Sequence, residues 1–252
     1  AGLGTALAYW AVLVVIILVM LKNKLIASYQ LWQWSPVQSS LLKAGLKLGL
    51  PIGLQVFAEV AIFAVVSLQM AKFSSQVIAA HQSAMNFATL LYAFPVSVSM
   101  ALPIVISYEI GANRPQAARQ YAIIGRLTAI LFAGLTLTFL YFNRQMVAGW
   151  YGQNPVFIRL TADFLVFALF FQLADAFTAP IQGILRGYKD TTVPFLLGLI
   201  SFWSLTFPIA FLLEGTTDLG PKAYWVGLIV GIFACGITLN IRMHIVEKRT
   251  VQ

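Results

Sequence analysis

Two carboxylates, Glu59 and Asp175, lie far inside long apolar stretches of this sequence. The other six acidic residues lie near the ends of such stretches or between them. A charged side chain at the centre of a membrane-spanning helix costs roughly 2.5–3.5 kcal/mol on insertion scales, so such residues generally serve a function. In an apolar setting, the chemistry open to a carboxylate is to bind a cation or to take up a proton.

The two carboxylates are expected at the same depth in a membrane. Glu59 follows Lys47 by 12 residues, and Asp175 precedes Arg186 by 11 residues. At a rise of about 1.5 Å per residue they lie about 18 and 16 Å from the same basic rim, near the middle of an apolar core about 30 Å thick. We therefore expect one shared cation or proton site. The alternative is two separately buried carboxyl groups, each protonated and hydrogen-bonded to a neighbouring helix.

Several amides accompany the two carboxylates at helical spacing. Gln55 stands one turn before Glu59, and two glutamines share a helical face with Asp175. Polar stripes of this kind either line a cavity or hold helices together by hydrogen bonds, and for any one residue both interpretations stay open. The candidate cavity residues of this type are Gln55, Gln82, Asn86, Gln172 and Gln182.

Prolines and a histidine lie close to this polar set. Pro95 and Pro180 each lack the amide that would bond a helical carbonyl one turn earlier, those of Leu91 and Ala176. A freed carbonyl can ligate a cation, although a plain kink is the commoner result. For His81, a hydrogen-bonded packing role is favoured over a role as a proton relay.

The elements that must position these residues are membrane-spanning helices. Of the 252 residues 60% are apolar and 10% are charged, whereas soluble domains carry about 25% charged residues. This composition excludes a soluble enzyme, a disordered chain and a secreted disulfide scaffold, for which one cysteine is also too few. We expect an all-α polytopic membrane protein whose seven helices lie near residues 5–21, 48–71, 77–108, 116–142, 156–185, 193–213 and 223–242.

The basic residues indicate how these helices are oriented. Twelve lysines and arginines fall on one side of the predicted membrane and four on the other. By the positive-inside rule the richer side is cytoplasmic, so we expect the N-terminus of the chain outside the plasma membrane and the C-terminus inside. The net charge of +8 is therefore interpreted as a mark of topology and not of nucleic-acid binding.

Three local features refine this arrangement. Ser35 and Pro36 are typical of a helix start, so residues 35–47 are expected to form a short interfacial helix before the next span. The stretch 77–108 contains two prolines and is expected to be bent or broken. Aromatic belts are expected at the inner side from Trp32 and Trp34, and at the outer side from Trp150, Tyr151, Tyr224 and Trp225.

Several ordered motifs carry a family resemblance. The segment 48–59, LGLPIGLQVFAE, resembles the seventh span of transporters of the multidrug and toxic compound extrusion (MATE) family, in particular of its NorM-like branch. The segment 79–86, AAHQSAMN, resembles the eighth span, and residues 175–190 resemble the tenth span and its inner loop. The resemblance covers spans six to twelve of a twelve-span family.

This resemblance implies a domain organisation. Residues 1–22 correspond to the last span of an N-terminal lobe, residues 23–47 to a cytoplasmic loop between lobes with its interfacial helix, and residues 48–252 to a six-helix C-terminal lobe. The chain begins with Ala1 and lacks the first lobe, so we expect a fragment of a larger transporter. Transport is expected to need the missing lobe.

The resemblance also implies a function. Members of the family export bulky, often cationic, amphiphilic compounds, driven by inward flow of Na⁺ or H⁺, and are not enzymes. Glu59 and Asp175 match the acidic cation-site residues, and Tyr92 matches an aromatic residue implicated in cation contact. Phe171 stands where some members have tyrosine, so one hydroxyl ligand for Na⁺ is missing. No cofactor is implied; the partners are small cationic or amphiphilic compounds, the lipid bilayer and the missing N-terminal lobe.

Two other functions remain as less favoured alternatives. A flippase for lipid-linked precursors shares the general fold, but it usually needs a cationic cavity, whereas the two mid-membrane charges here are acidic. A membrane anchor or assembly subunit that transports nothing has no need of paired acids at one depth.

Overall fold

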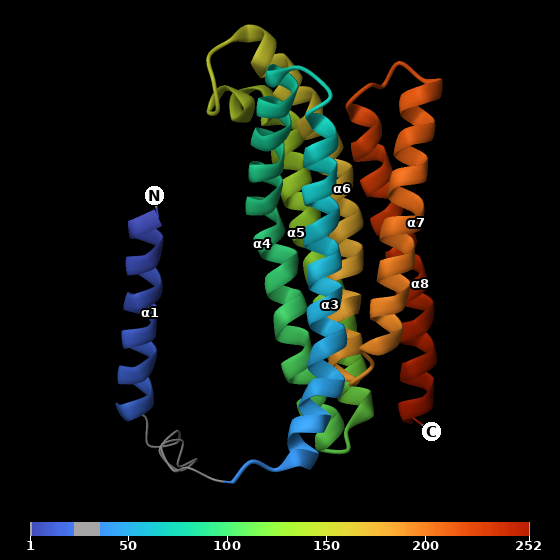
Figure 1. The fold of residues 1–252 in the computed structure, drawn as a ribbon. Helices are drawn as coiled ribbons and strands as arrows, with labels where there is room; N and C mark the ends of the chain where they lie inside the picture. The colour runs from blue at the N-terminus through green and yellow to red at the C-terminus, as the bar shows by residue number, and fades with distance from the viewer. Residues whose placement is uncertain (1, 23–35, 252) are drawn as a thin grey trace. The chain divides into compact units, whose positions relative to one another are not determined.

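The structure, a computed structural model, describes residues 2–22 and 36–251, and these form seven α-helices (Figure 1). Within these ranges, six of the helices are long and apolar enough to cross a membrane, whereas the apolar segment Ala6–Lys22 of the first is shorter. The expected all-α architecture with seven helices is therefore confirmed. The helices are α1 (Gly2–Lys22), α3 (Ser39–Met70), α4 (Ser75–Gly111), α5 (Pro115–Gly149), α6 (Pro155–Gly187), α7 (Thr192–Thr216) and α8 (Lys222–Val251).

The chain divides into two compact units, residues 1–45 and 46–252. The first unit contains α1 and the beginning of α3, and the second contains the rest of α3 and the five helices that follow it. Short connections join the helices of the second unit into an antiparallel bundle (Figure 1). The two mid-membrane carboxylates and all the candidate cavity residues belong to this bundle.

Capped helix starts let the chain reverse within a few residues. Ser74 precedes α4 and accepts a 3.4 Å hydrogen bond from the amide of Val77. Asn154 precedes α6 and accepts a 2.9 Å hydrogen bond from the amide of Val156. Both α5 and α6 have proline as their first residue, a position where a helix does not need the missing amide. Successive helices of the bundle can therefore run antiparallel with little connecting chain.

The start of α3 differs from the prediction. The helix begins at Ser39, after Pro36, and continues without interruption through Pro51. The separate interfacial helix expected over residues 35–47 is therefore wrong, because the described part of that segment is the beginning of the long helix. A proline has a φ angle that suits a helix and removes only one backbone hydrogen bond, so Pro51 alone does not end it. Residues 23–35, which include Trp32, Trp34 and Ser35 of the predicted loop, lie outside the described residues.

Other helices also run further than expected. α4 is continuous from Ser75 to Gly111 and is not broken at either of its inner prolines. α5 reaches Gly149 instead of residue 142, and α8 reaches Val251 instead of residue 242. The predicted helix ends were placed where the apolar stretches end. Polar and charged residues can continue the backbone hydrogen bonding of a helix beyond such an end.

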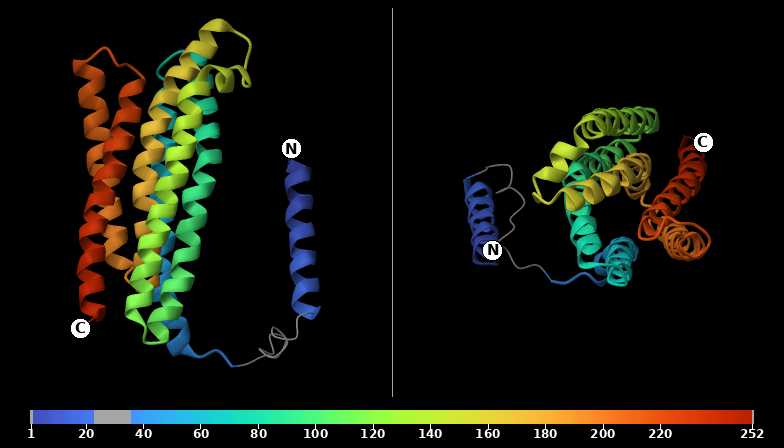
Figure 2. Two further views of the ribbon diagram at one scale, coloured as in Figure 1. Left: turned by 180° about the vertical axis from the view of Figure 1, so that it is seen from behind. Right: turned by 90° about the horizontal axis from the view of Figure 1, so that it is seen from above.

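Small residues bring the helices of the bundle together. α6 packs against α4, α5 and α8, and α7 packs against α8 (Figure 2). At the crossing of α4 and α6, a Cβ atom on Gly183 would overlap the carbonyl oxygen of Ser99, and Pro103 lacks the amide that would bond that carbonyl within α4. Gly227 of α8 meets the carbonyl of Thr206 in the same way. Glycine at these positions allows two backbones to touch.

The outer aromatic belt is only partly as expected. Trp150 and Tyr151 are 62% and 37% exposed, but Tyr224 and Trp225 are fully buried. The Trp225 ring packs edge-on against His81 of α4 and contacts rings of α6. Tyr224 and Trp225 therefore belong to the core, because the first turn of α8 is enclosed by its neighbouring helices.

Candidate functional site

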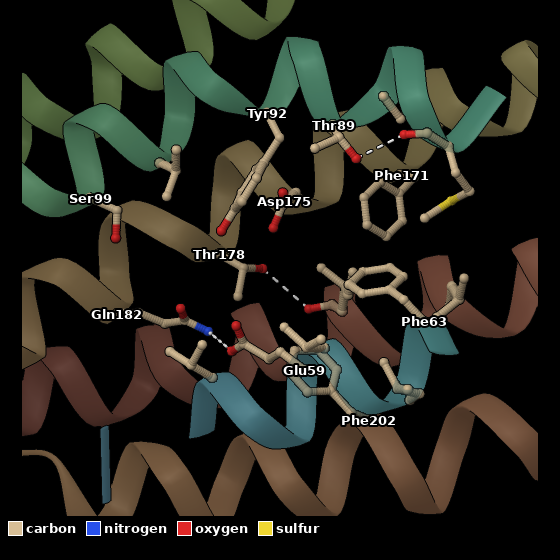
Figure 3. Close-up of a pocket in the computed structure, with 18 of the residues that line it drawn as sticks. Glu59, Phe63, Thr89, Tyr92, Ser99, Phe171, Asp175, Thr178, Gln182 and Phe202 are labelled. Carbon is tan, nitrogen blue, oxygen red and sulfur yellow. Dashed lines mark hydrogen bonds between the residues drawn. The ribbon is translucent and has the colours of Figure 1, made fainter. Parts of the chain in front are cut away.

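The bundle contains a cavity of about 360 Å³ that is enclosed by α3, α4, α6, α7 and α8 (Figure 3). Its walls are mainly apolar, with a few polar side chains among them. Val60 of α3 and Met100 of α4 line it and are 61% and 67% exposed, so the cavity opens to the surface of the bundle between these two helices. The polar residues of the wall are Glu59, Thr89, Tyr92, Ser99, Asp175, Thr178, Gln182 and Arg186.

Both mid-membrane carboxylates line this cavity. Glu59 comes from α3 and Asp175 comes from α6, and each is half-buried. Figure 3 shows Glu59 on α3 and Asp175 on α6, with the side chain of Tyr92 reaching in from α4 beside Asp175. The structure therefore brings together two acidic residues that the sequence placed at one depth on separate helices.

Amide donors hold Glu59 in place. Its Oε1 accepts a 2.9 Å hydrogen bond from Gln182 Nε2 of α6 and a 3.2 Å hydrogen bond from Gln55 Nε2, one turn earlier on α3. Gln55 is buried and does not itself line the cavity, whereas Gln182 does. Two donors that meet on one oxygen fix the orientation of the carboxylate, and a charged acceptor strengthens both bonds.

Asp175 lies in a different setting, close to Tyr92 and Thr178 (Figure 3). The hydroxyl of Thr178 is already engaged, because its Oγ1 lies 2.8 Å from the carbonyl oxygen of Ala174 and 3.2 Å from that of Ile232. The single proton of that hydroxyl is therefore directed at the backbone of α6 and α8. The aspartate is left facing the cavity.

Two aromatic side chains named from the sequence also line the cavity. Tyr92 presents its ring and hydroxyl to the interior (Figure 3). Phe171 packs edge-on against Phe63, with ring centroids 5.6 Å apart, and against Trp225 at 6.3 Å. Because phenylalanine has no hydroxyl, the side chain at position 171 offers no oxygen ligand.

The remaining candidate residues lie outside the cavity wall. Gln172 is buried, and its Nε2 donates a 3.1 Å hydrogen bond to the carbonyl oxygen of Leu91, the carbonyl that Pro95 leaves without a helical partner. Gln172 thus joins α6 to α4, and the freed carbonyl is occupied. Gln82 and Asn86 are exposed and do not line the cavity; Asn86 Oδ1 accepts a 2.8 Å hydrogen bond from the hydroxyl of Tyr151.

His81 is a buried, hydrogen-bonded packing residue. Trp225 Nε1 donates to its Nδ1 at 3.2 Å, so Nδ1 is the acceptor and the other ring nitrogen carries the proton. That nitrogen, Nε2, lies 3.3 Å from the hydroxyl oxygen of Ser67. His81 does not line the cavity, and both of its ring nitrogens have structural partners.

Sequence reasoning missed Arg186 as a residue of the site. The sequence places Arg186 at the predicted basic rim, yet it lines the same cavity as the two carboxylates. A signal was present, because Arg186 lies four residues after Gln182 on a helical face shared with Asp175. The cavity therefore contains two acidic groups and one basic group.

A family model described as MatE matches residues 51–212, which include both carboxylates. The chain is 53% identical over 99% of its length to the "Probable multidrug resistance protein NorM" of Streptococcus pneumoniae R6, and 42% identical over 100% of its length to the protein of the same name from Bacillus subtilis 168. It covers 55% and 56% of these two proteins. The chain thus spans about half the length of the curated relatives that it matches.

Solved structures share the fold. A eukaryotic MATE transporter, AtDTX14, superposes with a TM-score of 0.83 over 97% of this chain and 57% of that one, at 16% identity. A MOP superfamily transporter from Pyrococcus furiosus superposes with a TM-score of 0.76 over 88% of this chain and 50% of that one, at 15% identity. At such low identity the likeness concerns the arrangement of helices.

Proposed function

The chain belongs to the MatE family of multi-pass membrane transporters, and on this basis we propose that it works in an antiporter that exports multiple drugs or organic cations in exchange for Na⁺ or H⁺. The observation that carries this proposal is that Glu59 and Asp175, from different helices, line one cavity that opens to the surface of the bundle. In this proposal Glu59 and Asp175 bind the coupling ion. No covalent chemistry is involved.

The proposed mechanism is alternating access with reciprocal occupancy. Two carboxylates in one apolar cavity repel each other when both are ionised, and a bound cation or proton relieves this repulsion. The occupied and empty cavities therefore favour different conformations, and the coupling ion shifts the equilibrium between inward-open and outward-open states. A cationic drug competes for the same negative charge, so that drug and coupling ion alternate.

Neighbouring residues have distinct roles in this proposal. Gln55 and Gln182 orient the Glu59 carboxylate. Tyr92 offers its ring face to a cation, which is attracted by the ring quadrupole. Phe171 supplies an apolar wall for the hydrophobic part of a compound, as its packing against Phe63 suggests.

Topology completes the proposal. The α4–α5 and α6–α7 connections and the end of α8 lie at one end of the bundle (Figure 1), and the chain near them carries most of its basic residues. We assign that end to the cytoplasm by the positive-inside rule. Residues 48–252 act as one lobe, residues 1–22 as the last span of another and residues 23–47 as the loop between them. The exported compound then crosses between this lobe and an N-terminal lobe.

Ethidium accumulation tests the proposal in cells that lack their own efflux pumps and express the chain within its complete open reading frame. Glu59→Gln and Asp175→Asn are each expected to abolish efflux driven by a Na⁺ or proton gradient. Asp218→Asn is the matched control, because Asp218 is exposed and lies outside the cavity. Undiminished gradient-driven efflux by both cavity variants would refute the assigned coupling site.

The same assay separates the alternatives. A lipid-linked precursor flippase usually has a cationic cavity, whereas this one carries two carboxylates and one guanidinium. A flippase or an assembly subunit would leave ethidium accumulation independent of both ion gradients in the unaltered protein.

A further inference from the structure

Arg186 places a permanent positive charge in the wall of the cavity. It is the only lysine or arginine among the residues that line the cavity in the described bundle. Its Nε is buried without a hydrogen-bond partner, and none of the ion pairs formed within residues 36–251 includes it. Two other arginines at this end of the bundle form ion pairs: Arg242 pairs with Asp190 at 2.6 Å and Arg114 with Glu109 at 2.9 Å. The charge of Arg186 is therefore available to the cavity.

The position of Arg186 couples it to the carboxylates. One turn of helix separates Arg186 from Gln182, whose amide is bonded to Glu59. Along α6 the cavity wall thus presents Asp175, then Gln182, then Arg186. In the proposed topology, the guanidinium of Arg186 lies at the cytoplasmic end of this row.

A count of charges gives the consequence. A guanidinium stays protonated in proteins, so the cavity has a net charge of −1 when Glu59 and Asp175 are both ionised. Uncompensated charge in an apolar interior is costly, so the neutral cavity is favoured. Neutrality then requires one further unit of positive charge. In the absence of Arg186 it would require two.

We propose that Arg186 is the resident counter-charge of this cavity and limits it to one monovalent cation or one proton at a time. The inference rests on the proposed function, because it specifies how much positive charge the coupling site of that transporter accepts. One coupling ion then balances one monocationic compound in the cavity. Arginine suits this role better than lysine, because a buried lysine can lose its proton and with it the charge.

Counting the ions displaced by an organic cation tests the inference. Tetraphenylphosphonium is added at saturation to the purified complete protein in weakly buffered detergent solution, and released H⁺ and Na⁺ are measured with a pH electrode and a Na⁺-selective electrode. The two electrodes separate the two possible ions. One bound tetraphenylphosphonium supplies one positive charge. The unaltered protein, Arg186→Lys and Arg186→Gln are therefore each expected to release one ion, and a second ion stays bound in Arg186→Gln.

A double substitution separates charge from structural damage. Glu59→Gln leaves one carboxylate and the guanidinium, so no ion is expected to be released. Glu59→Gln combined with Arg186→Gln leaves one carboxylate alone, and the release is expected to return to one ion. Damage to the fold would not restore the count, and this comparison remains decisive if Arg186→Gln alone proves unstable. Lys189→Gln removes an exposed charge outside the cavity and is expected to release one ion.

The possible failures are distinguishable. Two ions released by the unaltered protein, or a Glu59→Gln/Arg186→Gln double variant that releases none, as Glu59→Gln does, would overturn the role of Arg186 and leave the coupling site standing. A release that is unaffected by Glu59→Gln and by Asp175→Asn would overturn the proposed function itself.

Discussion

Gln182 of α6 donates a 2.9 Å hydrogen bond to Glu59 of α3, so the helix that bears one cavity carboxylate also holds the other. Gln55 donates to the same oxygen from within α3. The position of the Glu59 carboxylate therefore depends on how α3 and α6 sit beside each other. A change in that relationship alters the proposed coupling site directly.

Gln182→Leu removes this link while keeping a side chain of similar size. A hydrogen bond to a charged group contributes about 1.5–3 kcal/mol, which corresponds to roughly tenfold or more in an equilibrium constant. Because the ionised form of Glu59 loses stabilisation, proton binding is expected to strengthen about tenfold, and the competing proton then raises the Na⁺ concentration needed for efflux. Ethidium efflux measured against Na⁺ concentration and against pH gives both values. Gln82→Leu is the control, since Gln82 is exposed and outside the cavity, and equal shifts in the two variants would contradict the expectation.

Gly183→Ala is expected to separate α4 from α6. The added Cβ would overlap the Ser99 carbonyl oxygen, a backbone atom that cannot rotate away. Overpacking of this kind costs about 1–3 kcal/mol, so the apparent melting temperature of the purified protein should fall. Gly134→Ala is the matched control in α5, where nothing lies within 4 Å of the added atom, and it should be neutral or slightly stabilising. Equal melting temperatures for the two variants would speak against the close contact.

Gln172→Leu is expected to destabilise the bundle without changing its ion dependence. The substitution leaves the buried Leu91 carbonyl without its 3.1 Å partner, at a cost of about 1–3 kcal/mol. Adding Pro95→Ala restores the amide that can bond this carbonyl within α4, so the double variant should recover much of the lost thermal stability. Failure of Pro95→Ala to rescue would mean that the Gln172 amide matters for another reason.

His81→Phe is expected to lower stability and leave the pH profile of efflux unchanged. The substitution removes the acceptor of the Trp225 indole N–H and the partner of Ser67, at a cost of about 1–3 kcal/mol. Efflux measured between pH 6 and pH 8.5 and divided by the amount of folded protein isolates the effect on coupling. A flattened profile would instead support the proton relay.

Much of the coarse structure was predictable from spacing alone. The apolar stretches predicted seven helices, and counting residues from the basic rims placed Glu59 and Asp175 at one depth. Both inferences depend on distance along a helix axis, which the constant rise per residue sets. Features that depend on neighbours were not predictable in this way. One example is that α3 continues through Pro51. Whether a helix continues there depends on whether it tolerates the loss of one backbone hydrogen bond.

By itself, the sequence determined the membrane class, the number of helices and the family, and it predicted one depth for the two acids. Only the tertiary structure decided which side chains meet at that depth. It enclosed Tyr224 and Trp225 in the core, turned Gln172 to a backbone carbonyl and brought Arg186 into the cavity with the carboxylates. The physical reason is that depth follows from the chain alone. The direction in which a helix face points is set by packing against helices that are distant in the sequence.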